Sequence, residues 1–190
     1  MLPVQLKPKN DPELQSKLIV EIPNVLNDVQ IEQLRLYTQS EYSGLHRRGS
    51  KDINTNASFY TCQVHPLDHE IYNILDPIWS IYKHELQFIE PYEIKSYVEG
   101  DLFSYHNDTY LNLDQHVARK LNLIIQMSDD NEYEGGDLEL ILGADKDTIK
   151  MPRKKGKLIM FPSYIIHQVT PVTKGQRHSL VGWITGKPFV

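Results

Sequence analysis

The stretch YVEGDLFSYHND, residues 97–108, decides most of what this sequence predicts about its fold. Its second half, LFSYH, reads as a short β-strand that ends at His106, and Asp108 follows two positions later. Side chains two positions apart on extended backbone project to the same side. The imidazole and the carboxylate can therefore meet one ligand. A second histidine, His167, ends the later run FPSYIIH.

Two histidines and one carboxylate on one side of a metal leave its opposite side open, an arrangement typical of non-haem Fe(II) oxygenases. Arg177 lies ten positions after His167, before the apolar run SLVGWI. Its guanidinium could form a fork with the far carboxylate of a dicarboxylate ligand whose other end binds the metal. A zinc site would use the same three ligands, but zinc does not explain Arg177. Lys174 is the next candidate for the anchor.

Length and composition indicate one globular domain over residues 1–190, with 40% hydrophobic and 24% charged residues. No apolar run approaches the ~20 residues that cross a bilayer, so we expect no membrane partner. A net charge of −5 gives no basic face, so we expect no nucleic-acid partner. The single cysteine, Cys62, excludes an internal disulfide and suits a reducing compartment, so the predicted location is cytoplasmic. The oligomeric state is left open.

The first part of the chain, residues 1–91, is predicted to form a helical buttress and a substrate loop. A strand is expected at 17–22, followed by a helix whose cap is Asn27, with Gln30 in the capping-box position. A second amphipathic helix is expected over 68–86. Between them, residues 43–56 are polar and contain two glycines, which predicts a mobile loop that could close over the site as a lid. His46, Arg47 and Arg48 are candidate substrate contacts there, although a solvated loop explains them as well.

The sequence pattern changes at residue 92: residues 92–188 consist of short alternating or apolar runs that are separated by turns. The expected strands are 93–97, 102–106, 121–127, 138–142, 148–151, 157–161 and 177–185. Gly156 is expected in a tight turn between two of them. Strands spaced this evenly indicate an antiparallel sandwich or barrel.

These motifs together resemble the 2-oxoglutarate- and Fe(II)-dependent dioxygenases, in particular the prolyl 4-hydroxylase-like branch with the PKHD-type hydroxylases of bacteria and phages. The resemblance rests on Tyr97 to Asp108, on Arg119 to Leu140 with the motif YEGGDL at 133–138, and on Gly156 to Arg177. It covers residues 92–188. It implies a mainly β fold with flanking helices: a double-stranded β-helix, the jelly-roll or cupin-like barrel, buttressed by the N-terminal helices.

The resemblance also implies roles for particular residues. His106, Asp108 and His167 would bind Fe(II), and Arg177 would bind 2-oxoglutarate as the fourth catalytic residue. Tyr97 would donate a hydrogen bond to this co-substrate. Gln126 stands where several family members have an aromatic residue that helps to hold 2-oxoglutarate, and Asn122, on the same strand, is a further candidate contact. Trp183 is either a neighbour of the metal histidine or part of the core.

The implied activity is hydroxylation of an unactivated C–H bond, with release of succinate and CO2 and with ascorbate as a candidate reductant. Family resemblance favours a protein or peptide substrate, modified at a prolyl or another peptidyl side chain. Two alternatives stay open: an oxygenase that acts on a small molecule, and a non-catalytic module that binds metal and 2-oxoglutarate.

Overall fold

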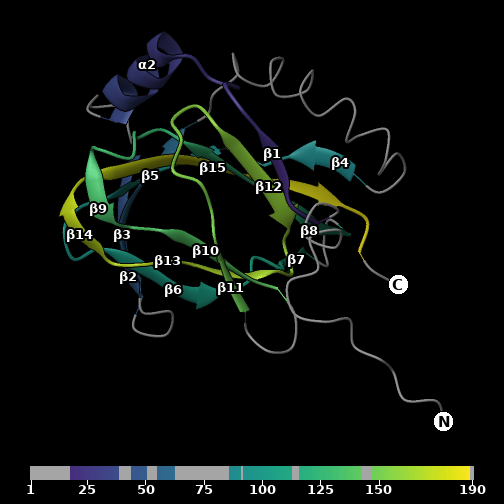
Figure 1. Cartoon of the computed structure of the whole chain (residues 1–190). Helices are drawn as coiled ribbons and strands as arrows, with labels where there is room; N and C mark the ends of the chain where they lie inside the picture. Colours follow the sequence, from purple (N-terminus) through teal and green to yellow (C-terminus); the bar gives the residue numbers. More distant parts are fainter. Residues whose placement is uncertain are drawn as a thin grey trace.

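The computed structural model describes residues 18–38, 44–50, 55–62, 86–90, 92–112, 116–142 and 147–188 (Figure 1). The described helix is α2 (Asp28–Thr38). The strands are β1 (Val20–Ile22), β2 (Gly44–Ser50), β3 (Thr55–Cys62), β4 (Leu86–Ile89), β5 (Tyr92–Tyr97), β6 (Leu102–His106), β7 (Leu111–Asn112), β8 (Val117–Gln126), β9 (Tyr133–Gly135), β10 (Leu138–Leu142), β11 (Asp147–Lys150), β12 (Leu158–Pro162), β13 (Ile166–Val169), β14 (Val172–Gly175) and β15 (Arg177–Gly186).

The main sheet runs in the order β1-β12-β8-β15-β5-β3-β6-β13-β10-β11, and every neighbouring pair is antiparallel. Only two residue pairs join β3 to β6, Thr55 with Phe103 and Asn56 with Leu102. Around this short junction the sheet folds over, so that β6, β13 and β10 face β5, β15 and β8 across the interior (Figure 1). This is the predicted double-stranded β-helix.

Strand β8 shows why the barrel has two cores. Its residues are buried at nearly every position, because both of its faces are covered. Leu121, Leu123, Ile125 and Met127 belong to the cluster that includes Ile31 and Leu34 of α2, whereas Ile124 belongs to the cluster between the two sheets. A strand covered on both faces reads in sequence as a continuous apolar run. The same alternation turns Asn122 and Gln126 toward the interior, where the pocket is built.

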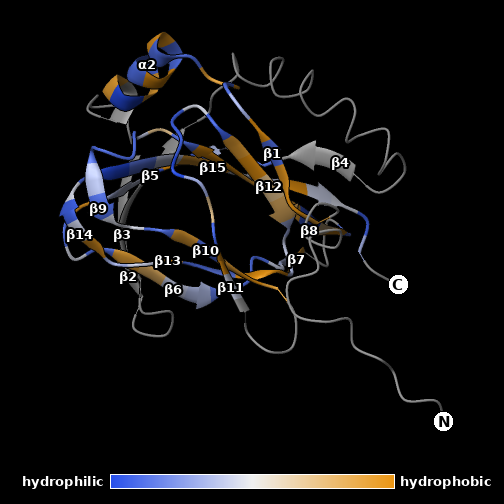
Figure 2. Cartoon of the chain, in the orientation of Figure 1, coloured by the Kyte–Doolittle hydropathy of each residue, from blue (hydrophilic) through white to orange (hydrophobic). Residues whose placement is uncertain are grey.

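Helix α2 covers the outer face of the sheet that contains β5 and β15 (Figure 1). The predicted capping box is confirmed: the Asn27 amide donates to Gln30 Oε1 at 2.9 Å, and the Gln30 amide donates to Asn27 Oδ1 at 3.0 Å. Figure 2 shows hydrophilic and hydrophobic residues side by side on α2, while β12 is mainly hydrophobic. Among the described residues no helix is long and apolar enough to cross a membrane.

The loop expected at 43–56 needs correction, and the helix expected at 68–86 lies almost entirely outside the described residues. The predicted loop at 43–56 is wrong for residues 44–50 and 55–56, which lie in β2 and β3 and form an antiparallel pair. Polar, glycine-containing composition does not reveal such a hairpin, because pairing of β3 with β5 supplies its stability. The lid hypothesis based on that loop is therefore withdrawn. The predicted helix at 68–86 lies outside the described residues, except for Leu86, which begins β4.

The expected strands of the second half are confirmed as elements, with β6 and β10 at the predicted bounds. The short strands β7, β9 and β14 were not expected, since two to four residues carry too little periodicity. His167 was expected to end a strand that opens at Pro162. It is instead the second residue of β13, because the chain turns after Pro162, where the Ile165 amide donates to the Pro162 carbonyl oxygen at 3.0 Å. Gly156 lies in the predicted turn with φ +75°, and a Cβ there would come within 2.5 Å of the Leu26 carbonyl oxygen. The turn therefore needs glycine both for its backbone angle and for its contact with the segment before α2.

Candidate active site

The two candidate metal histidines face each other across one strand pair. His106 ends β6 and His167 lies in β13, and the two are direct partners in the antiparallel register. The Nδ1 of His106 lies 2.7 Å from the Ser104 carbonyl oxygen, and that of His167 lies 3.0 Å from the Ile165 carbonyl oxygen. A carbonyl only accepts, so each Nδ1 carries the proton and donates. Both Nε2 atoms are then left with a free lone pair for a metal.

Asp108 completes the cluster. Its Oδ1 lies 3.6 Å from His106 Nε2 and its Oδ2 lies 3.4 Å from His167 Nε2. The three donor atoms all lie within 4.8 Å of one another. Two nitrogens and one carboxylate oxygen at this spacing fit a divalent metal bound on one side, which is the 2-His-1-carboxylate arrangement of non-haem Fe(II) oxygenases.

The surroundings set the protonation states that metal binding needs. Burial, helped by the nearby His167, lowers the pKa of His106 to about 4, although Asp108 opposes this shift. Burial would raise the pKa of Asp108, but the neighbouring His167, together with Lys95, holds it well below its usual range. At neutral pH the imidazole of His106 is neutral and the carboxylate is ionised, as metal ligands must be.

Ser163 and Asn122 fix the backbone around Asp108 through two hydrogen bonds. The Asp108 amide donates to the Ser163 carbonyl oxygen at 2.9 Å, and Ser163 Oγ donates to Asn122 Oδ1 at 2.8 Å. Asn122 is fully buried but is not among the pocket-lining residues. The expected contact of Asn122 with the co-substrate therefore finds no support in this geometry. Asn122 instead contacts Ser163, whose carbonyl oxygen fixes the backbone of Asp108.

Arg177 lies at the other end of the same pocket and is 1% exposed. It donates from Nη1 to Ser179 Oγ at 3.1 Å and from Nη2 to Gln126 Oε1 at 3.2 Å, while its buried Nε has no hydrogen-bond partner. No ion pair joins Arg177 to a carboxylate in the described part of the chain. A buried guanidinium without a counter-ion is costly, so the pocket suits a ligand carboxylate.

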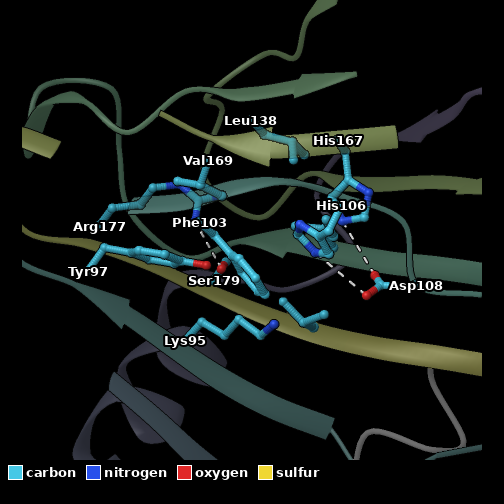
Figure 3. Close-up of a pocket in the computed structure, with 12 residues that line it drawn as sticks. Lys95, Tyr97, Phe103, His106, Asp108, Leu138, His167, Val169, Arg177 and Ser179 are labelled. Carbon is cyan, nitrogen blue, oxygen red and sulfur yellow. Dashed lines mark hydrogen bonds and ion pairs between the residues drawn. The ribbon is translucent and has the colours of Figure 1, made fainter. Parts of the chain in front are cut away.

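Tyr97 lies directly opposite Arg177 in the β5–β15 register, with its ring centroid 5.2 Å from the guanidinium carbon. Burial raises the pKa of Tyr97, so the phenol keeps its proton and can donate a hydrogen bond into the pocket. Gln126 accepts a hydrogen bond from Arg177 with its carbonyl oxygen but is not among the pocket-lining residues, so its expected contact with 2-oxoglutarate stays a prediction. Figure 3 shows Arg177 and Tyr97 on one side of the pocket and the three candidate metal ligands on the other.

The pocket residues that were not singled out from the sequence include Lys95, Phe103 and Ser179. Phe103 stacks on the His106 ring with centroids 3.9 Å apart. Lys95 and Ser179 each lie two positions from a predicted site residue on the same strand, Tyr97 and Arg177. The two-residue period of a strand could have found both, because residues two apart share a face. Trp183 packs in the core between the sheets, and Arg119 lies 3.9 Å over its ring.

Lys95 is a buried cation beside the candidate metal ligands. Its burial lowers its pKa, while Glu93 and Asp108 favour the charged form. Two of the histidines that were given no role in the site, His116 and His178, lie among the described residues outside the pocket lining. His116 is exposed, and His178 lies within reach of Ser96 Oγ, at 3.3 Å, rather than in the pocket lining.

Comparisons with known proteins agree with this geometry. A family model described as the 2OG-Fe(II) oxygenase superfamily matches residues 92–185. A PKHD-type hydroxylase of Shewanella oneidensis is 29% identical over 177 residues, which cover 88% of this chain and 78% of the relative. The matched segment of the family model contains all three candidate metal ligands and Arg177.

Two solved structures have the same fold. The crystal structure of a Pseudomonas putida prolyl-4-hydroxylase superposes with a TM-score of 0.71 at 18% identity and covers 94% of this chain and 97% of that one. A viral collagen prolyl hydroxylase from Paramecium bursaria Chlorella virus-1, in its 2OG complex, superposes with a TM-score of 0.66 at 20% identity, over 90% and 98% of the two chains. The family model and the curated relative show that the chain belongs to the 2OG-Fe(II) oxygenase superfamily, in its PKHD-type branch.

Proposed function

We propose that this 2-oxoglutarate- and Fe(II)-dependent dioxygenase hydroxylates a peptidyl side chain, with proline as the first candidate. We assign Fe(II) to His106, Asp108 and His167, and the far carboxylate of 2-oxoglutarate to Arg177. The observation that carries the proposal is one pocket lined by both the metal cluster and a buried arginine. A closed zinc site needs no such cation, whereas a non-catalytic module that binds metal and 2-oxoglutarate would share this geometry and is distinguished by turnover.

When bound, Fe(II), 2-oxoglutarate and O2 supply the oxidation that converts a C–H bond to C–OH, with succinate and CO2 released. The protein positions the ligands of the metal and of 2-oxoglutarate, and it excludes water from the pocket. Carbonyl oxygens of Ser104 and Ile165 orient the two imidazoles, and Ser179 and Gln126 hold the Arg177 fork in place. Leu138, Val169 and Val181 line the same pocket with apolar surface, which keeps water away from the ion pairs.

Exposure around the cluster indicates the side from which the substrate approaches. The side chains of His106 and Asp108 are 14% and 15% exposed, whereas that of His167 is 5% exposed. Tyr105 does not belong to this side, because it precedes His106 on β6 and points to the opposite face of the strand. The prolyl hydroxylases that share the fold favour a peptide over a small molecule.

Two further assignments accompany the proposal. Ascorbate, as a reductant of the iron, remains a prediction. A cytoplasmic location is proposed because a single cysteine and a ferrous site both suit a reducing compartment.

Turnover assays test the proposal. Purified protein with Fe(II) and 2-oxoglutarate is incubated with a library of proline-containing peptides, and both succinate formation and the gain of one oxygen atom by a peptide are measured. We expect both, each dependent on added Fe(II). Succinate formation without any modified peptide would refute a peptidyl substrate and favour a small molecule. No succinate under any condition would refute the oxygenase assignment for this chain.

A further inference from the structure

We propose that Lys95 is a second carboxylate-binding residue of the pocket, which pairs with the carboxylate of 2-oxoglutarate nearest the metal. Arg177 would hold the far carboxylate and Lys95 the near one. This inference rests on the proposed function, because it assumes that 2-oxoglutarate occupies the pocket.

The first support is the position of Lys95 in the sheet. It lies in β5, two residues before Tyr97, and its direct partner on β15 is Ser179, just as the partner of Tyr97 is Arg177. Directly opposed residues in an antiparallel pair have Cβ atoms about 5 Å apart. Lys95 therefore points into the barrel beside the hydroxyl that receives the Arg177 Nη1 hydrogen bond.

The second support is the place of the ammonium group within the pocket. Lys95 Nζ lies 4.9 Å from the centroid of the Phe103 ring, which stacks on His106, and 5.4 Å from the centroid of the Trp183 ring. Figure 3 shows the side chain extended beneath Tyr97 and Phe103, with its nitrogen toward the side where His106 and Asp108 lie. The cation thus lies at the metal end, whereas Arg177 lies at the opposite end.

The third support is charge. Among the described residues that line the pocket, the charged groups are the cations Lys95 and Arg177 and the carboxylate Asp108. Glu93 Oε2 lies 3.8 Å from Lys95 Nζ, but the Glu93 side chain is 31% exposed and does not line the pocket. With a divalent metal bound, the pocket is therefore positive at both ends, which suits a ligand with a carboxylate at each end.

The fourth support is depth, which decides between co-substrate and primary substrate. Lys95 is 6% exposed, deeper than the side chains of His106 and Asp108 beside which a primary substrate would bind. A ligand that reaches its ammonium group has to lie inside the barrel, between the strands that also carry Arg177. A dicarboxylate with one end on the metal meets this requirement.

Calorimetric binding to Mn(II)-loaded protein, which performs no turnover, tests the inference. Two ligands are compared: 2-oxoglutarate, and 2-oxobutyrate, a keto acid that lacks the far carboxylate. Lys95→Met keeps the length of the side chain and removes the charge. We expect it to weaken both ligands by a similar factor, roughly ten- to a hundredfold, as loss of a buried charge-assisted hydrogen bond does. Arg177→Met should weaken only 2-oxoglutarate.

Controls separate the possible failures. Lys174→Met, which alters a lysine whose side chain is 74% exposed and which does not line the pocket, should change neither affinity. The Mn(II) affinity and the melting temperature show whether a variant keeps its site, and Lys95→Arg replaces Lys95→Met if the latter does not fold. In that case we expect a smaller loss, equal for both ligands, because the charge is kept but misplaced.

Three results would overturn the inference alone: unchanged affinities in the Lys95 variant, a loss confined to 2-oxoglutarate, or a loss of Mn(II) binding that fully accounts for the effect. Failure of the unaltered Mn(II)-loaded protein to bind 2-oxoglutarate would instead overturn the proposed function.

Discussion

Replacing Arg177 with methionine isolates its role, because methionine fills most of the same volume without the charge. Arg177 is 1% exposed and its fork is already fixed by Ser179 and Gln126, so a bound carboxylate would gain a preorganised, desolvated partner. Truncating one partner of such a pair costs ~2–5 kcal/mol. That range corresponds to a loss of roughly 30- to 4,000-fold in affinity for 2-oxoglutarate.

The kinetic signature distinguishes anchoring from chemistry. The KM for 2-oxoglutarate should rise by that factor, while kcat at saturating 2-oxoglutarate stays within a fewfold, because the guanidinium contacts the end of the ligand far from the metal. Arg177→Lys should recover part of the affinity, since a point charge keeps attraction but loses the fork. An unchanged KM in Arg177→Met, with metal retained, would refute the anchor. Lys174, the alternative anchor expected from the sequence, has a side chain that is 74% exposed and does not line the pocket, so it would not take over this role.

Three further predictions follow from the same geometry. His167→Ala should abolish retention of Fe(II) measured by metal analysis after gel filtration, because two ligands bind too weakly, whereas His116→Ala should retain it. Gly136→Ala should weaken 2-oxoglutarate binding: at φ +60° a Cβ is strained and would come within 3.2 Å of Arg177 Cδ, so normal affinity would contradict the assigned position of the fork. Burial, reinforced by Arg35, lowers the pKa of His178 to about 4. The unfolded chain, with a histidine pKa of about 6.5, therefore binds more protons between these values. The contribution of His178 to stability should be complete above pH 6.5 and fall by about 2 kcal/mol at pH 5. Urea unfolding at both pH values should show a fall in stability that is about 2 kcal/mol smaller in His178→Gln than in the unaltered protein, because His106 contributes to the fall in both.

The sequence by itself determined the elements whose signals are local. The spacing of His106 and Asp108 on one strand, the capping box at Asn27, and the long apolar strand β8 all depend on residues a few positions apart, where backbone geometry fixes the relation between side chains. The candidate ligands, Arg177 and Tyr97 all line one pocket, and Gln126 accepts a hydrogen bond from Arg177, while the roles assigned to them stay predictions. The resemblance to the dioxygenases supplied what spacing could not, namely the assignment of His167 and Arg177 to the same site.

Only the tertiary structure decided which distant residues meet. The register of β6 with β13 places His167 opposite His106, and the fold of the sheet at the short β3–β6 junction closes the pocket. The hairpin of β2 and β3 is polar in sequence and is stabilised by pairing with β5, so its composition predicted a loop. Asn122 faces the interior as expected but contacts Ser163, and Lys95 lines the pocket as a buried cation. Such outcomes depend on which strands become neighbours. Strand order is set by burial summed over the whole barrel, and no local pattern of residues contains it.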